Sequence, residues 1–242
     1  MNDAEINQMA QFESYYWWHI GRREIIRSLL NKCVHRPFSR ILDYGCGTGG
    51  NLSLLADFGE TWGSDCNDKA LSFCRGKGHV NLLSNKQDHV PDGCFELIAA
   101  LDVIEHVRED AHLLAEFFNI ISPGGLLLIS VPAYPFLWSE HDEALGHYRR
   151  YRANELREKL RAAGFEIVRS THAISFVLLP IIIYRCVRRS LYRNQHRAAN
   201  SYVTLPKSIN ALLAWFLTIE SKIVQKTDIP FGCSLLCLAR RP

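Results

Sequence analysis

The sequence predicts an α/β fold built on a mainly parallel sheet, and three observations support this prediction. Short apolar runs alternate with amphipathic stretches of helix length between residues 39 and 171. A glycine-rich turn follows the first of these runs directly. The length of 242 residues also suits one α/β domain with additions.

The first segment, residues 1–36, reads as an N-terminal helical cap rich in aromatic side chains. Its cluster from Tyr15 to Trp18, together with Arg22 and Arg23, would either cover a ligand or pack plainly into the core. Strands are then expected at 39–44, 60–65, 79–83, 95–101 and 125–131, with helices at 50–58, 67–76 and 109–121. This alternation predicts right-handed crossovers and a parallel sheet.

A polar loop from Ala133 to Arg152 follows the fifth strand, at the sheet edge where ligands bind in open α/β folds. We expect a helix over 153–163, ended by Gly164 as its C-cap, and a sixth strand over 165–171. An unusually long connection begins with an apolar run, in which Pro180 is expected to interrupt the helix. It closes with an amphipathic helix at 208–226 before a last strand at 234–240.

The glycine turn is the most specific motif of the chain. Gly45, Gly47 and Gly50 fit the dinucleotide pattern G-x-G-x-x-G, with Asp65 about 20 residues further on as a ribose-binding acid. Asp43, however, lies two residues before the first glycine, where its carboxylate would repel a pyrophosphate. An ammonium or sulfonium ligand would instead be attracted to it.

With these residues the chain resembles the class I S-adenosylmethionine-dependent methyltransferases, and within them the ubiquinone-biosynthesis type O-methyltransferases. The first motif of that family matches Asp43 and 45–49, and later motifs match 91–98, 100–107 and 122–125. The resemblance implies a Rossmann-like sheet of seven strands, mostly parallel with an antiparallel last strand, and helices on both faces. It divides the chain into the cap at 1–36, a cofactor-binding core at 37–172, a helical insert at 173–231 and the final strand at 232–242.

The same resemblance implies S-adenosyl-L-methionine as the cofactor. Asp65 would take the ribose hydroxyls, and Ser84 or Asn85, or else Asp88, would have to contact adenine because the usual acid is missing there. The expected cofactor-binding residues are Asp43, Gly45, Cys46, Gly47, Gly49, Asp65, Cys66, Ser84, Asn85, Leu101 and Asp102.

Methyl transfer mainly requires alignment, and a general base helps when the acceptor is a hydroxyl. The candidate bases are His147, His141 and His106, although His106 would alternatively pack beneath the adenosine. Imidazole and carboxylate groups also suit a divalent metal, but their spacing matches no closed site and we predict none. The expected substrate-binding residues are Asp142, Tyr148, Arg149 and Arg150. The two arginines would either clamp an anion or pair with Glu140 and Glu143.

Charge is distributed unevenly along the chain. Residues 1–147 hold 11 basic and 20 acidic side chains, a net charge of −9, whereas residues 148–197 hold 12 and 3, a net charge of +9. An acidic first half disfavours a nucleic-acid partner, while the segregation favours one face that meets an anionic partner. The apolar run Phe176–Tyr184 and five arginines after it predict either a cap over the cleft or docking on an anionic membrane, through Arg185, Arg188, Arg189, Arg193 and Arg197.

Eight cysteines without metal-type spacing, and no preceding signal peptide, predict reduced thiols and a cytoplasmic protein, with peripheral attachment to the inner face of a membrane as an option. The function we expect is methyl transfer to oxygen of a small-molecule, lipid-linked or glycan acceptor. The residues 101–104 do not form the motif typical of nitrogen methylation. The alternatives are a nicotinamide-dependent oxidoreductase and a non-catalytic scaffold of the same fold.

Overall fold

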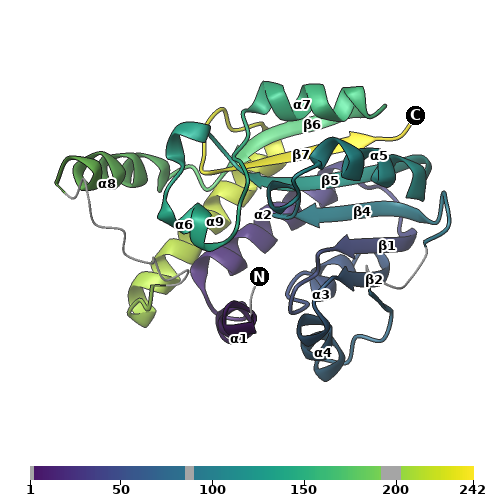
Figure 1. The fold of residues 1–242 in the computed structure, drawn as a ribbon, viewed down its shortest axis with the longest axis horizontal. Coiled ribbons are helices and arrows are strands. Elements are labelled where there is room, and N and C mark those ends of the chain that lie inside the picture. The colour runs from purple at the N-terminus through teal and green to yellow at the C-terminus, as the bar shows by residue number, and fades with distance from the viewer. Residues whose placement is uncertain (1–2, 85–89, 192–202) are drawn as a thin grey trace.

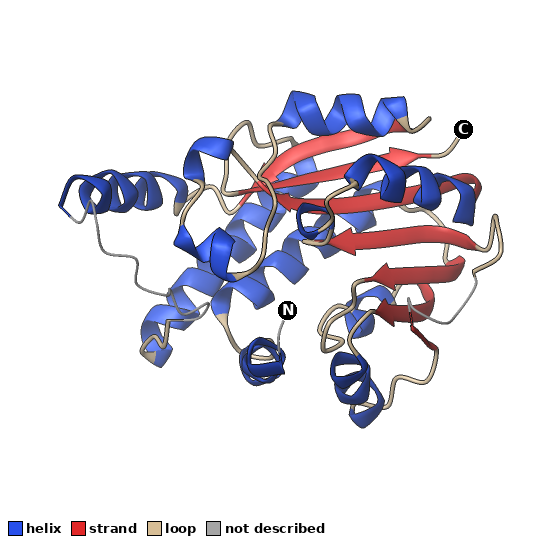
Figure 2. Cartoon of the chain, in the orientation of Figure 1, coloured by secondary structure: helices blue, strands red, loops and turns tan. Residues whose placement is uncertain are grey.

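The structure is a computed structural model, and it describes residues 3–84, 90–191 and 203–242. One seven-stranded sheet forms its centre (Figures 1 and 2). In spatial order the strands are β3 (Leu82–Ser84), β2 (Gly59–Asp65), β1 (Phe38–Tyr44), β4 (Phe95–Leu101), β5 (Ile121–Pro132), β7 (Ser234–Arg240) and β6 (Glu166–Ala173). Only β7 is antiparallel to its neighbours β5 and β6. The predicted fold is therefore confirmed.

Helices cover both faces of this sheet (Figure 1). The face that carries Ile41, Leu97 and Leu128 is packed against α2 and α9, and the opposite face against α5 and α7. The described helices are α1 (Asp3–Phe12), α2 (Trp17–Cys33), α3 (Leu52–Leu55), α4 (Asp68–Gly76), α5 (Asp110–Ile120), α6 (Glu140–Ala144), α7 (Ala153–Ala162), α8 (Leu178–Leu191) and α9 (Lys207–Lys226), with short 3-10 turns η1 (Ile104–His106) and η2 (Pro135–Leu137).

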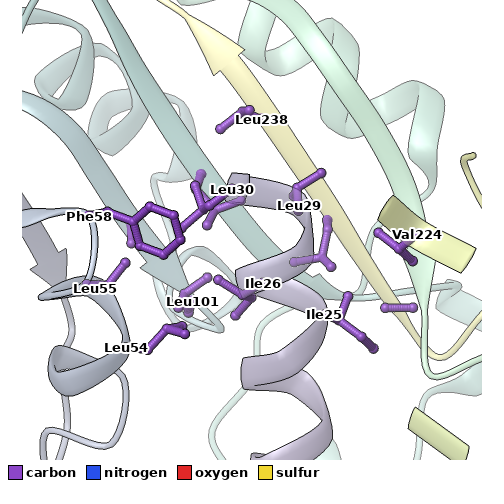
Figure 3. Packing of buried hydrophobic residues seen from close by; sticks show 14 of the residues in the cluster. Ile25, Ile26, Leu29, Leu30, Leu54, Leu55, Phe58, Leu101, Val224 and Leu238 are labelled. Carbon is purple, nitrogen blue, oxygen red and sulfur yellow. The ribbon is translucent and has the colours of Figure 1, made fainter. Parts of the chain in front are cut away.

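In the core beneath α2, this helix from the N-terminal part of the chain packs against α9 from the C-terminal part. Ile25 and Leu29 of α2 and Val224 of α9 are buried in one cluster against the sheet, and Figure 3 shows Ile25 beside Val224. α9 can approach α2 closely because Gly21 has no side chain, and a Cβ atom there would overlap the side chain of Leu217. The amphipathic helix predicted within the insert is thus a buried layer of the core along one of its faces.

Several local predictions are corrected by the structure. The N-terminal segment is two helices, because the chain turns between Phe12 and Trp17. Pro180 does not interrupt a helix, since it lies in the first turn of α8, where a missing N–H costs nothing. Phe176 packs against Trp17 and Phe216, with ring centroids 6.1 and 5.3 Å away, so the apolar run begins partly buried.

Within the described ranges, no helix is long and apolar enough to cross a lipid bilayer.

Candidate cofactor and acceptor site

The glycine turn after β1 forms the floor of the candidate site. Gly45, Gly47 and Gly49 all have positive φ angles of 72°, 54° and 86°, a conformation that side chains with a Cβ rarely adopt. Asp65, at the end of the neighbouring strand β2, accepts hydrogen bonds from the backbone N–H groups of Gly47 (2.9 Å) and Asn67 (2.8 Å). The strand-end acid and the glycine turn therefore form one unit, as the sequence predicted.

Asp43 supplies a second acid beneath this turn. It is 1% exposed, and its Oδ2 atom has no hydrogen-bond partner. Burial raises the pKa of Asp43 to about 7, with Asp65 adding to the shift and Arg22 opposing it. A buried carboxylate without a partner is unfavourable unless a donor or a cation completes it.

Arg22 of α2 carries positive charge into the same region. Its guanidinium forms an ion pair with Asp102 and lies 4.4 Å from the ring centroid of Trp18. Asp102 follows β4 with a positive φ of 59° and also accepts a hydrogen bond from Ser130 (2.8 Å). The sequence left open whether the aromatic segment covers a ligand or packs into the core. In the structure Trp18 packs against Arg22, which is paired with Asp102 in the loop after β4. No local signal in the sequence links Arg22 to Asp102.

The helix α1 lies over the glycine turn. Met9 is in close contact with Gly47, such that a Cβ on this glycine would come within 2.9 Å of the Met9 side chain. Glu13, only 3% exposed, accepts a hydrogen bond from the Thr48 hydroxyl (2.6 Å) and an ion pair from Lys77. The N-terminal segment thus covers the place where the sequence predicts a cofactor.

The remaining predicted cofactor residues lie around this floor. Cys46 is buried in the turn with its Sγ atom 3.9 Å from that of Cys74, and this contact and burial raise the pKa of Cys46. Cys66 is exposed after β2, and Leu101 is buried at the end of β4. Ser84 ends β3. The predicted adenine contacts Asn85 and Asp88 lie outside the described residues.

A second cluster lies in the loop after β5 and is centred on Asp142. This residue is fully buried, and its Oδ1 atom lies 3.1 Å from Nδ1 of His147 and 2.6 Å from Nε of Arg150. Burial alone would raise the pKa of Asp142, but the hydrogen bond with His147 and the ion pair with Arg150 hold it well below its ordinary value. Asp142 is thus ionised near neutral pH, and its carboxylate fixes the orientation of the His147 ring.

The loop brings His147 to the predicted base at the end of β4. Its ring meets that of His106 edge to face, with centroids 4.6 Å apart, and the Tyr148 N–H donates to the Glu105 carbonyl (2.8 Å). Burial, and then the charge of His147, lower the pKa of His106 to about 4. Burial also lowers the pKa of His141. Neutral His106 and His141 rings can accept hydrogen bonds near pH 7.

Glu105 belongs to this cluster, and the sequence analysis missed it. The side chain is fully buried, neither carboxylate oxygen has a hydrogen-bond partner, and burial raises its pKa well above the ordinary value. One ligand atom each of Glu105, His106 and His147 lies within 4.8 Å of the others, an arrangement that can hold a divalent cation. Spacing along the chain cannot reveal this group because His147 comes from a distant loop.

The two predicted anion-binding arginines are already paired. Arg150 is bound to Asp142 and donates to the Ala133 carbonyl (3.1 Å). Arg149 pairs with Asp110 (3.1 Å), which also accepts hydrogen bonds from Tyr151 and Lys159. The ion pairs of Arg149 and Arg150 described above are therefore made with aspartates. Tyr148 is half exposed beside them, with Arg108 over its ring.

Taken together, the fold and the paired strand-end acids define a Rossmann-like nucleotide-binding protein with a polar second cluster at the same sheet edge. The sequence matches the profile of the family described as "Methyltransferase domain" over residues 17–170. This match covers more than half of the chain, which therefore belongs to that family. The predicted resemblance to class I S-adenosylmethionine-dependent methyltransferases is confirmed at this level.

Individual relatives agree with the family. A probable S-adenosylmethionine-dependent methyltransferase of Mycolicibacterium smegmatis is 30% identical over 64% of this chain and 61% of its own length. The trans-aconitate 2-methyltransferase of Deinococcus radiodurans is 27% identical over 69% of this chain and 64% of its own length. The alignments thus span less than two thirds of either relative.

Solved structures share the fold. A chain in the complex between the Haloferax volcanii Trm112 methyltransferase activator and a methyltransferase matches with a TM-score of 0.63 at 18% identity, over 99% of this chain and 95% of that one. Phosphoethanolamine N-methyltransferase 2 of Haemonchus contortus, solved with S-adenosyl-L-methionine, matches with a TM-score of 0.56 at 16% identity, over 90% of this chain and 52% of that one.

Proposed function

We propose that the protein is an S-adenosyl-L-methionine-dependent methyltransferase. The observation that carries this proposal is the pair of acids at the glycine turn, Asp65 bound to the Gly47 N–H and Asp43 buried with an unpartnered oxygen. An S-adenosylmethionine molecule offers a positively charged amino acid end for Asp43, which lacks a partner at one oxygen, and ribose hydroxyls that can donate to the remaining lone pairs of Asp65. The family and its named relatives support the same cofactor.

In this proposal each residue of the turn has a separate task. Asp65 would accept from the ribose hydroxyls, and the glycines would let the backbone approach the ligand. The Asp43 carboxylate would form an ion pair with the cationic end of the cofactor. Arg22, which is buried and held by Asp102, is placed to balance a carboxylate in the same pocket. When bound, the cofactor supplies an electrophilic methyl group.

The second cluster supports oxygen as the acceptor atom. Asp142 holds Nδ1 of His147, so the proton at that atom faces the carboxylate and Nε2 is the nitrogen left to accept a proton. A hydroxyl acceptor must lose a proton as the methyl group is transferred, and His147 would take it. Asp142 is then a positioning residue for the His147 ring.

The two alternatives are less well supported. A nicotinamide-dependent oxidoreductase would have to place a pyrophosphate near the buried Asp43 carboxylate, which charge repulsion opposes. A non-catalytic scaffold would not need the two acids of the cofactor site, Asp43 and Asp65, and both are present.

Calorimetry with S-adenosyl-L-methionine tests the cofactor assignment. Losing a charged acceptor costs about 1.5 to 3 kcal/mol, so Asp65→Ala should weaken binding by about one to two orders of magnitude. The exposed Asp68→Ala, three residues away, is the matched control and should bind normally. Equal affinities for a folded Asp65→Ala protein and the wild type would contradict the assignment.

Methyl transfer is tested with labelled S-adenosyl-L-methionine and cell extracts separated into soluble and lipid fractions. His147→Gln should bind the cofactor normally but lose at least about a hundredfold in transfer rate, the size of a general-base contribution. The exposed His112→Gln serves as its control. Wild-type transfer by His147→Gln would show that this loop has no catalytic base.

A further inference from the structure

One face of α9 exposes an unbroken apolar stripe. The opposite face is in the core, where Leu217 and Val224 are fully buried against α2. The outer side chains recur every three or four residues, the spacing of one helix face, and 37–55% of each is exposed. They are Ile209, Leu212, Trp215, Phe216, Ile219 and Ile223, and together with Lys207, Lys222 and Lys226 we call them the α9 face.

Single exposed apolar residues are ordinary, but a stripe along a 20-residue helix marks an interaction surface. The neighbouring helix α8 repeats the pattern, with Leu179, Ile183 and Val187 exposed at intervals of four residues. In Figure 1, α8 and the beginning of α9 lie on the side where β4 and β5 end. This is the side of the proposed active site.

The charges around the stripe select its partner. Along its length, α9 contains three basic side chains and a single acid, Glu220. Glu220 is buried, where it accepts hydrogen bonds from the backbone N–H of Ser175 (2.9 Å) and of Ile174. The exposed charges of α9 are therefore all positive, on Lys207, Lys222 and Lys226. An anionic lipid surface favours such one-sided positive charge beside an apolar helix face.

We propose that the α9 face docks the protein on an anionic lipid bilayer. The helix would lie in the plane of the headgroups, with Trp215 and Phe216 at the acyl boundary and the lysines at the phosphates. The sequence predicted this function for Phe176–Tyr184 and the following arginines; Phe176 is partly buried against Trp17, whereas Leu179, Ile183 and Tyr184 are exposed. Arg193 and Arg197 lie outside the described residues, and the α9 face does not depend on them.

Docking would also bring the proposed active site to the membrane. Asn210, in the first turn of α9, accepts from the Trp17 N–H (2.9 Å) and donates to the Tyr15 carbonyl (2.8 Å). It is thus tied to the segment between α1, which covers the glycine turn, and α2. Provided that the proposed methyltransferase function holds, the acceptor is an amphiphile drawn from the lipid surface.

Sedimentation of the full chain with lipid vesicles tests the docking itself. The protein should sediment with vesicles of phosphatidylcholine and phosphatidylglycerol at low salt, and should stay in solution with phosphatidylcholine alone. High salt should release it, because the Debye length shrinks from ~10 Å at 0.1 M to ~3 Å at 1 M. Vesicles with brominated acyl chains should quench Trp215 emission, and this quenching should be lost in Trp215→Phe.

Two variants and their controls locate the contact. Replacing Lys207, Lys222 and Lys226 by Gln should weaken vesicle binding on the order of a hundredfold, since each basic residue contributes roughly fivefold. Replacing Leu212, Trp215 and Ile219 by Gln, which preserves helix propensity, should weaken it by at least about tenfold. The matched controls replace exposed residues of other elements by Gln, namely Arg75, Arg161 and Arg240 for charge and Val80 and Val168 for apolar contact.

Wild-type protein that stays in the supernatant with anionic vesicles at low salt would overturn the proposal. So would a dimer that the apolar variant converts into a monomer without any vesicle binding, because the α9 face would then bind a second copy. Calorimetry with S-adenosyl-L-methionine on the same samples keeps the two proposals apart. Vesicle binding without cofactor binding would contradict the proposed function alone, and the reverse result would contradict the docking alone.

Discussion

At the scale of single residues, Asp43 is the group whose protonation should control cofactor binding. Its folded pKa is raised to about 7 by burial, so near neutrality the free protein holds a mixture of the neutral and the ionised form. A cationic ligand binds the form with ionised Asp43. In protein molecules whose Asp43 is neutral, binding therefore releases the proton of that carboxyl group. We expect the affinity for S-adenosyl-L-methionine to rise as the pH is raised through 7 and then to level off.

Calorimetry in buffers of different ionisation enthalpy measures this proton release directly. Asp43→Asn should bind more weakly and lose the pH dependence in this range, while Asp65→Asn should bind more weakly but keep it. An affinity that is flat across neutral pH in the wild type would mean that the cofactor does not meet Asp43.

At the scale of elements, the packing of α2 on α9 depends on one glycine. A methyl group on Gly21 would overlap the Leu217 side chain, and overpacking of this kind typically costs about 1 to 3 kcal/mol. Gly21→Ala should therefore lower the free energy of unfolding by about that amount. Gly76→Ala is the control, because it lies at the end of α4 with open space around it and should be neutral or stabilising by about 0.4 to 1 kcal/mol.

Urea unfolding of a double-mutant cycle checks the cause. Leu217→Ala alone should leave a cavity, but in the Gly21→Ala background it should cost less, since it removes the overlap. Strictly additive effects would show that the two helices move apart freely, and that their contact does not anchor the α9 face.

Elements were also the level at which the sequence was most informative. Alternating apolar runs and a glycine turn predicted the strands β1, β2 and β4, the helices α4, α5 and α7, and the C-cap at Gly164, because these features are local. α6 and the early part of α8 were not predicted correctly, since their stability comes from tertiary contacts such as the buried Asp142. The interruption predicted at Pro180 was wrong because the effect of a proline depends on where the helix begins, and α8 begins at Leu178.

At the scale of the whole molecule, long-range contacts decide what sequence reasoning can reach. The two acids at the glycine turn lie at the ends of their strands and could be predicted, whereas the pairing of Arg22 with Asp102 joins distant segments and could not. The same holds for Glu105. It lies in a matched motif, but its place in a possible cation site could not be predicted, because His147 of that site comes from the loop after β5. The separation of charge along the chain predicts an anionic partner for the segment after β6, and the contacts within the described residues do not decide that prediction.

Asp142 holds the loop after β5 together through Ser139, His147 and Arg150, and its carboxylate should shape the acid stability of the whole protein. The folded pKa of Asp142 is depressed, chiefly by His147 and Arg150 against the effect of burial. Its stabilising contribution is therefore fully present above the unfolded pKa of about 3.9, and it is lost as the pH falls toward the lower folded pKa. Asp142→Asn leaves Arg150 buried without its partner, and removing one member of a buried pair costs about 3 to 5 kcal/mol.

We therefore expect Asp142→Asn to unfold at a lower urea concentration than the wild type at neutral pH, and the gap between the two proteins to narrow as the pH falls below about 4. Unfolding curves at a series of pH values measure this convergence, and the exposed Glu109→Gln should follow the wild type throughout. A gap of constant size down to the acid transition would show that Asp142 acts through shape and hydrogen bonding alone. Its charge would then not be what stabilises the loop after β5.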